Sequence, residues 1–189
     1  MSTDDINRAR NFAIKAHGGQ KYGDGLPYVH HLDRVYGKLV QFDVDEESLL
    51  VAAFLHDTIE DTNVTAEDII YNGFGAAVAQ LVSAVTNGPG KNRAERHANT
   101  YPKILACPGA VQLKLADRLA NVEYSFVNQS PQLEMYRKEQ AVFRAALYEE
   151  GVHSAMWKQL EKLLKADSKL LEVSRREGRM WVDENSKDS

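Results

Sequence analysis

Apolar residues recur at helical spacing along nearly the whole chain. The residues from Ile6 to Ala16 follow a period of about 3.6 that ends at Gly18-Gly19, which predicts a first helix capped by Thr3 or Asp4. A second predicted helix begins near Tyr28 to His31. The remaining predicted helices span Asp45 to about Glu60, Thr65 to Asn72, Phe74 to Thr86, Gly109 to about Phe126, Ser130-Pro131 to Glu149, and His153 to about Arg175. No segment alternates with a period of two, so we expect an all-α fold, with one compact multi-helix domain over residues 1–180 and a polar, frayed tail at 181–189.

The third predicted helix is apolar on every face between Leu49 and Leu55, which indicates that it lies at the centre of the fold. The second is expected to turn Val35, Leu39 and Val40 inward. Thr65 opens a sequence typical of a capping box, with an aspartate in its last place.

Composition limits the classes of partner. The formal net charge is −4, so no global cationic field holds nucleic acid or an anionic membrane surface, and we expect neither as a partner. No signal peptide and no membrane span can be recognised, and the single cysteine, Cys107, is interpreted as a semi-buried small hydrophobe. A cytoplasmic protein is therefore expected, and its oligomeric state is left open.

Ionisable residues follow the apolar centre of the third helix directly, in the run His56-Asp57-Thr58-Ile59-Glu60-Asp61. On an ideal helix His56, Asp57, Glu60 and Asp61 share one edge. Charges at the border of a core need a partner, and a divalent cation would draw these groups together. A helix end that is exposed to solvent could carry the same residues at no cost.

Two other segments carry polar groups at helical spacing. Lys114, Asp117, Arg118 and Asn121 share one face of an otherwise apolar helix, which fits either a site or a surface ladder of ion pairs. The stretch Lys91 to Lys103 is a local cationic patch that could meet a polyphosphate, or else a mobile solvated loop.

A set of motifs in fixed order resembles the HD-domain metal-dependent phosphohydrolase superfamily. Those motifs are Gly25-Leu26-Pro27-Tyr28-Val29-His30-His31, Leu55-His56-Asp57-Thr58-Ile59-Glu60-Asp61-Thr62, Phe74-Gly75, Val85-Thr86, and Lys114-Leu115-Ala116-Asp117-Arg118-Leu119-Ala120-Asn121. Within the superfamily they are most similar to the (p)ppGpp 3′-pyrophosphohydrolase domain of the stringent-response alarmone enzymes and their small stand-alone relatives. The resemblance covers roughly residues 5 to 165, and it implies a central buried helix that carries the His-Asp pair.

The resemblance implies a divalent metal ion, usually Mn²⁺ in this family, bound by His31, His56, Asp57 and Asp117. Two imidazoles and two carboxylates form a mixed nitrogen and oxygen set that suits a six-coordinate ion with water in the remaining positions. His30 is the competing imidazole, and His31 is preferred because it stands at the ligand position. Glu60 and Asp61 match the acids that orient the attacking water or accept its proton, although Glu60 could instead be a solvated helix-end carboxylate.

The resemblance places Asn121 beside the nucleoside. Lys114 or Arg118 could meet phosphate charge, although Arg118 could equally pair with a carboxylate. Arg93 and Arg96 belong to the cationic stretch, and Lys21 and Tyr22 to the connector before the Pro-Tyr motif. The family usually has an Arg-Lys pair in that connector, where this chain has Tyr22-Gly23, and Tyr22 could stack on a base alone. The chain stops after the hydrolase-like region, as a single-function hydrolase would.

Three functions compete. The leading hypothesis is an enzyme that uses a metal-activated water to hydrolyse the 3′-pyrophosphate of (p)ppGpp-like alarmones. A phosphohydrolase for another nucleotide, acting on a 2′- or 5′-phosphate of a dinucleotide or deoxynucleotide, is the alternative, because the connector is altered. A nucleotide-binding regulator whose catalysis has decayed is less favoured, since the ligand set and both acids are intact, and a plain helical scaffold would need none of them.

Overall fold

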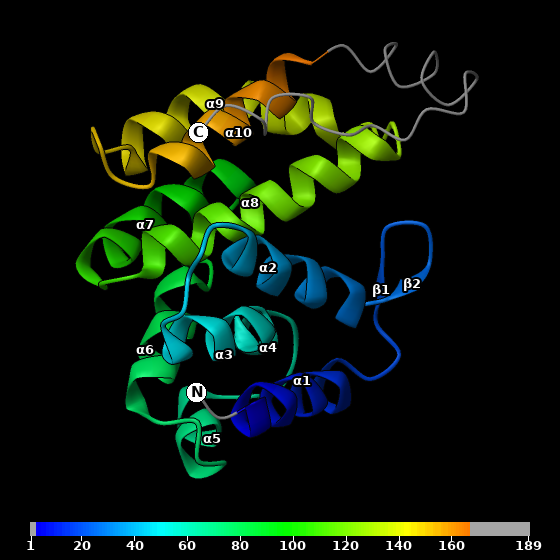
Figure 1. The fold of residues 1–189 in the computed structure, drawn as a ribbon, viewed down its shortest axis with the longest axis vertical. Coiled ribbons are helices and arrows are strands. Elements are labelled where there is room, and N and C mark those ends of the chain that lie inside the picture. The colour runs from blue at the N-terminus through cyan, green and yellow to red at the C-terminus, as the bar shows by residue number, and fades with distance from the viewer. Residues whose placement is uncertain (1–2, 167–189) are drawn as a thin grey trace.

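The computed structural model describes residues 3–166, and helices account for most of them (Figure 1). The helices are α1 (Thr3–His17), α2 (Val29–Gln41), α3 (Glu47–Leu55), α4 (Thr58–Asp61), α5 (Ala66–Tyr71), α6 (Ala76–Val85), α7 (Arg93–Ala106), α8 (Ala110–Val127), α9 (Gln132–Leu147) and α10 (Ser154–Lys165). A two-stranded antiparallel hairpin joins α1 to α2, with β1 at Lys21–Tyr22 and β2 at Leu26–Pro27. The predicted all-α class is confirmed, although the sequence pattern missed this small hairpin because two-residue strands are too short to show alternation.

Helix α3 forms the centre of the lower half of the molecule in Figure 1, where α1, α2, α6 and α8 pack around it. Every residue from Leu49 to Leu55 is buried, as the uniform apolar character predicted. Helix α8 packs against α2 on one side and α10 on another, so it joins α7, α9 and α10 to the half that contains α3.

The third predicted helix is interrupted. It was expected to run from Asp45 to about Glu60, but α3 ends at Leu55 and a separate turn of helix, α4, begins at Thr58. Asp57, between them, has φ −100° and ψ −4°, and the Thr58 hydroxyl donates back to the Leu55 carbonyl over 2.7 Å. The His-Asp pair therefore lies at the junction after the central helix, where its side chains are not limited to one helical edge.

The structure corrects one further expectation and excludes one of the two alternatives for another segment. Val40 is 47% exposed, because the buried stripe of α2 runs through His31, Leu32, Val35, Lys38 and Leu39. The stretch Lys91 to Lys103 is no solvated loop, since α7 begins at Arg93 under the Asn92 cap and buries Thr100, Tyr101 and Ile104. Pro102 within α7 concealed this helix from the sequence pattern.

Other boundaries agree with the pattern or lie outside the described residues. Thr65 and Asp68 form the reciprocal hydrogen bonds of the predicted capping box. The expected extension of the last helix to Arg175, the domain boundary at 180 and the tail at 181–189 fall beyond residue 166 and stay predictions. None of the helices within residues 3–166 combines the length and apolar character that crossing a membrane requires.

Candidate metal centre and active site

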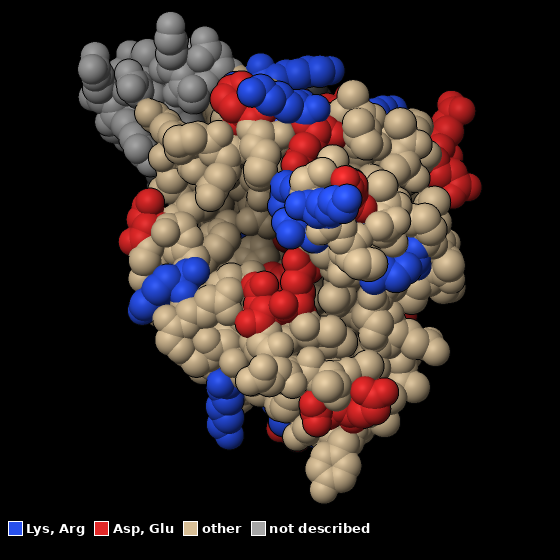
Figure 2. Space-filling model, turned by 180° about the vertical axis from the view of Figure 1, so that it is seen from behind, with Lys and Arg blue, Asp and Glu red and all other residues tan. Residues whose placement is uncertain are grey.

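A pocket of about 170 Å³ opens between α4, α7, α8 and α9, beside the start of α2. Its floor carries acidic side chains, including Asp57, Glu60 and Asp61, and its far wall carries Arg93 and Lys114. In the space-filling view, acidic groups gather beside a hollow with basic groups close by (Figure 2). The pocket therefore offers both a cation-binding end and an anion-binding end.

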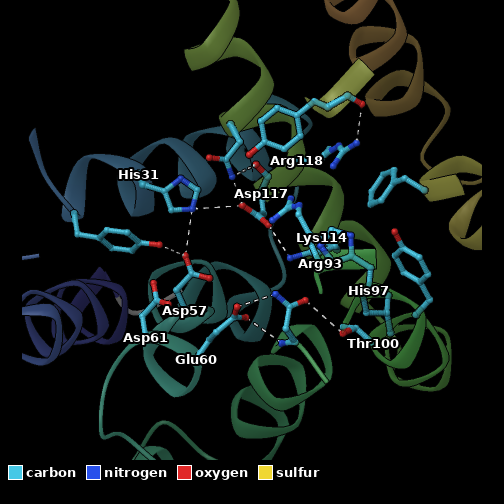
Figure 3. Close-up of a pocket in the computed structure, with 17 residues that line it drawn as sticks. His31, Asp57, Glu60, Asp61, Arg93, His97, Thr100, Lys114, Asp117 and Arg118 are labelled. Carbon is cyan, nitrogen blue, oxygen red and sulfur yellow. Dashed lines mark hydrogen bonds and ion pairs between the residues drawn. The ribbon is translucent and has the colours of Figure 1, made fainter. Parts of the chain in front are cut away.

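Four candidate donor atoms from three separate parts of the chain lie close together at the acidic end, and Figure 3 labels three of the residues that carry them, His31, Asp57 and Asp117. Nε2 of His31 lies 3.2 Å from Nε2 of His56 and 3.4 Å from Oδ1 of Asp117. Oδ2 of Asp57 lies 2.9 Å from His56 Nε2 and 3.4 Å from His31 Nε2. His31 is 2% exposed and comes from α2, whereas its neighbour His30 is exposed and is outside this cluster. The structure thus brings together the four residues that the sequence proposed as ligands.

Neighbouring groups fix the direction of each donor. His56 donates from Nδ1 to the Ala53 carbonyl over 2.9 Å, which leaves the lone pair of Nε2 pointing into the cluster. The Tyr28 hydroxyl donates to Asp57 Oδ2 over 2.6 Å. Asn121 donates to Asp117 Oδ1 over 2.6 Å, and Lys114 to the other Asp117 oxygen over 2.9 Å. Such outer contacts are typical of preorganised metal sites.

The charges of the cluster favour a cation at its centre. Burial alone would lower the pKa of His31, but hydrogen bonds with Asp117 and Asp57 raise that pKa to about 9. Burial would raise the pKa of Asp57, but His56 and His31 beside it hold that pKa well below the usual range. Burial would likewise raise the pKa of Asp117, but Lys114 and His31 hold it well below the usual range. Two ionised carboxylates with two imidazoles are a donor set that fits a divalent transition-metal ion, which would replace the proton on His31.

The two acids of α4 lie beside the cluster and are held from opposite sides. Glu60 accepts hydrogen bonds from the backbone and side-chain nitrogens of Asn87, over 3.0 and 2.7 Å. Asp61 accepts one from Gln20 Nε2 over 3.0 Å. Both carboxylates line the same pocket as His31, Asp57 and Asp117.

The basic residues differ in what they already contact. Arg118 is 5% exposed and donates to Glu139 over 2.9 Å and to the Tyr136 carbonyl over 3.0 Å. Arg93 donates to the other Glu139 oxygen over 2.7 Å. Arg118 thus pairs with a carboxylate, one of the two roles the sequence left open, while it also lines the pocket.

Of the remaining proposed contacts, Tyr22, Asn121, Lys21 and Arg96, only Asn121 lines the pocket. Tyr22 stacks on the His31 ring, with 4.9 Å between centroids, and donates to Asn121 Oδ1 over 3.0 Å. Lys21 and Arg96 are exposed, and neither is among the residues that line the pocket. The structure therefore brings Tyr22 and Asn121 to the cluster and leaves Lys21 and Arg96 at a distance from it.

Sequence reasoning missed several residues of the site, among them Asn87, Glu139 and His97. Asn87 stands in an Asn-Gly dipeptide that signalled only a turn, and Glu139 lies in an ordinary polar stretch of α9. His97 lines the pocket, and its pKa is lowered to about 4 by burial and by the neighbouring Arg93. His97 is consequently a neutral imidazole at physiological pH, next to the basic wall.

The fold and the site together define an all-helical domain with a histidine and aspartate cation-binding centre next to two further acids. The chain belongs to the HD domain family, whose profile matches residues 9–147. Its match spans the hairpin, the four candidate ligands and the two acids of α4.

Curated relatives carry names that refer to guanosine polyphosphates. The guanosine-3′,5′-bis(diphosphate) 3′-pyrophosphohydrolase of Aquifex aeolicus is 41% identical over 140 residues, which is 72% of this chain and 20% of that protein. MESH1 of Danio rerio, with the same enzyme name, is 36% identical over 116 residues, or 59% of this chain and 64% of that protein. A GTP pyrophosphokinase of Streptomyces coelicolor is 32% identical over 84% of this chain and 19% of its own length. This chain therefore spans about a fifth of two of these relatives.

A solved structure shares the fold. It belongs to a metazoan orthologue of SpoT that is described as hydrolysing ppGpp, and it superposes with a TM-score of 0.59 at 24% identity, over 95% of this chain and 99% of the other.

Proposed function

We propose that this protein hydrolyses the 3′-pyrophosphate of guanosine 3′,5′-bis(diphosphate) and related alarmones in a metal-dependent reaction. The observation that carries the proposal is the convergence of His31, His56, Asp57 and Asp117 beside the two acids of α4. Two of the relatives are named for this activity. In the reaction, water attacks the phosphorus bound to the 3′ oxygen, that phosphorus–oxygen bond breaks, and pyrophosphate and a free 3′-hydroxyl are released.

The four donors would hold one divalent ion, and Mn²⁺ is the ion we propose because the set mixes imidazole nitrogen with carboxylate oxygen. When bound, the ion would supply Lewis-acid activation of water and of a phosphoryl oxygen. Glu60 and Asp61 would orient the attacking water and accept its proton.

The far wall would bind the anionic part of the substrate. Lys114 and Arg93 carry positive charge along the pocket, and Arg118 backs them. Tyr22 and Asn121 would meet the nucleoside, whereas Lys21 and Arg96 could reach only phosphates that extend beyond the pocket. We place the protein in the cytoplasm and in the stringent response, with a small nucleotide as its partner.

One observation favours a second candidate, a phosphohydrolase for another nucleotide. The side chain of Asn121 donates to Asp117 and accepts from Tyr22, so it has little capacity left to recognise a base while Tyr22 stays in place. The altered connector could therefore select a different base or phosphate position.

A panel of nucleotides with added Mn²⁺ tests both candidates. Pyrophosphate release from the guanosine tetraphosphate, absent in Asp57→Ala protein, is expected. Release of phosphate from a different nucleotide alone would favour the second candidate. Binding of the tetraphosphate without turnover by the metal-loaded protein would instead identify a decayed regulator and contradict the proposal.

A further inference from the structure

A buried histidine outside the pocket is connected to one of the two acids. His17, the last residue of α1, is 7% exposed and does not line the pocket. Its Nδ1 lies 2.8 Å from Oε1 of Gln20, and Nε2 of Gln20 donates to Oδ2 of Asp61 over 3.0 Å. The side chain of Gln20 thus bridges His17 and Asp61.

The direction of these hydrogen bonds is set by the carboxylate. An ionised carboxylate only accepts, so Gln20 must present its NH₂ group to Asp61 and its carbonyl oxygen to His17. His17 must then carry its proton on Nδ1. The order of donation is therefore His17 to Gln20 to Asp61.

Backbone contacts hold this bridge in place. The Gln20 nitrogen donates to the His17 carbonyl over 3.0 Å, and the Tyr28 nitrogen donates to the Gln20 carbonyl over 3.1 Å. Gly18 turns the chain between α1 and Gln20 with φ +53°, a value that glycine adopts readily. Helix α1 also packs against α4, which carries Asp61.

The same imidazole contacts a second residue of the site. The His17 ring stacks on the ring of Tyr28, with centroids 4.4 Å apart and an interplanar angle of 25°, and Tyr28 donates to Asp57. One buried side chain therefore supports a donor to Asp61 and a donor to Asp57.

We infer that His17 and Gln20 are positioning residues that hold the carboxylate of Asp61 toward the pocket. This inference rests on the proposed function, because it assigns a purpose to the orientation of Asp61. Asp61 is exposed and lies on a single turn of helix, so its side chain would sample several rotamers without Gln20. Asn87 holds Glu60 independently of this bridge. Orientation of an acid toward an attacking water contributes directly to the rate.

A double-mutant cycle of Gln20→Ala and Asp61→Asn tests the inference with the full-length, Mn²⁺-loaded protein, using the nucleotide that the wild type cleaves. Gln20→Ala should lower kcat about 5- to 10-fold, which is the size of an ordinary net hydrogen-bond contribution of about 1 kcal/mol at an exposed position, and leave KM and Mn²⁺ affinity unchanged. In Asp61→Asn protein, the added Gln20→Ala should change kcat less than about twofold. Gln159→Ala, which removes another glutamine hydrogen-bonded at the surface, is the control and should not alter kcat. Additive effects of the two substitutions would overturn the inference.

A second measurement needs no substrate. The ¹⁵N chemical shifts of the His17 ring should report a proton on Nδ1 in the wild type, and Gln20→Ala should move population toward the Nε2–H form. A wild-type protein that cleaves no nucleotide overturns the proposed function, and the bridge is then judged by these shifts alone. An Nε2–H ring in the wild type, or no response to Gln20→Ala, overturns the inference.

Discussion

Replacing Glu139 by alanine should destabilise the protein more than any surface ion pair can explain. Glu139 on α9 accepts from Arg118 on α8 and from Arg93 on α7, over 2.9 and 2.7 Å, so it joins three helices. The Arg118 side chain is only 5% exposed and would stay buried with its charge uncompensated. Breaking a fully buried pair costs about 3–5 kcal/mol.

Two features reduce that figure. The Glu139 side chain is 23% exposed, and Arg118 keeps its bond to the Tyr136 carbonyl and its positions over the rings of Tyr136 and Phe143. We therefore expect Glu139→Ala to lower the free energy of unfolding by about 2–3 kcal/mol, which is about 5–10 °C in Tm for a domain of this size.

Urea denaturation at pH 7 measures the effect, with Glu134→Ala as the matched control. Glu134 lies on the same helix and pairs with Arg137, but its side chain is 63% exposed, so its loss should cost less than about 0.5 kcal/mol. Equal stabilities of the two variants would refute the reasoning, because the buried arginine would then have no need of Glu139.

The pH dependence of the free energy of unfolding provides a second test of the contacts that Glu139 makes. Burial tends to raise the pKa of Glu139, but hydrogen bonds from Arg93 and Arg118 outweigh it and bring that pKa below its ordinary value of 4.5. A carboxyl whose pKa is lowered by folding stabilises the folded state above the unfolded pKa, and that stabilisation is lost as the pH falls through the folded pKa. The stability difference between the wild type and Glu139→Ala should consequently shrink below pH 4.5.

Three other substitutions have expected outcomes. Asp117→Ala should abolish activity and also Mn²⁺ binding, which calorimetry measures, because the substitution removes one of the four donors and leaves Lys114 without its carboxylate. Retained activity in metal-free Asp117→Ala protein would contradict the assigned site. Glu60→Gln should keep Mn²⁺ affinity and lose turnover about 100-fold or more, and an unchanged kcat would remove Glu60 from the chemistry. Gly23→Ala should lower the free energy of unfolding by about 1–3 kcal/mol in urea denaturation, because the backbone at Gly23 has φ +52° and the new Cβ would lie 2.0 Å from the Tyr124 hydroxyl oxygen. In the control, Gly19→Ala, the new Cβ meets no atom within 4 Å, so that substitution should be neutral. Equal effects of the two glycine substitutions would show that the hairpin adapts.

The sequence pattern predicted which segments bury apolar surface, and most helices follow it. Helix α3 is the clearest case, since residues that are apolar on all sides leave no face for solvent. The pattern failed at α7, where Pro102 and several charges resemble a loop, because the burial of Thr100 and Tyr101 depends on helices distant in the sequence. It also failed after Leu55, where the helix ends without a glycine or proline to mark the change.

The candidate site divides in the same way. The sequence proposed His31, His56, Asp57 and Asp117 as donors for a metal ion, through the resemblance of its ordered motifs to the HD-domain phosphohydrolases. These four residues lie within a few ångströms of one another only because α2, the α3–α4 junction and α8 pack together, which local periodicity does not encode.

By itself, the sequence determined an all-helical fold, its central helix and the ionisable groups from which the candidate site is built. Only the tertiary structure decided which of those groups are held and by what: Asp61 by Gln20, Glu60 by Asn87, and Arg118 by Glu139. The reason is physical. Burial of apolar surface repeats with the helical period and can be recognised locally, whereas a hydrogen bond between residues far apart in the chain exists only after the helices have packed.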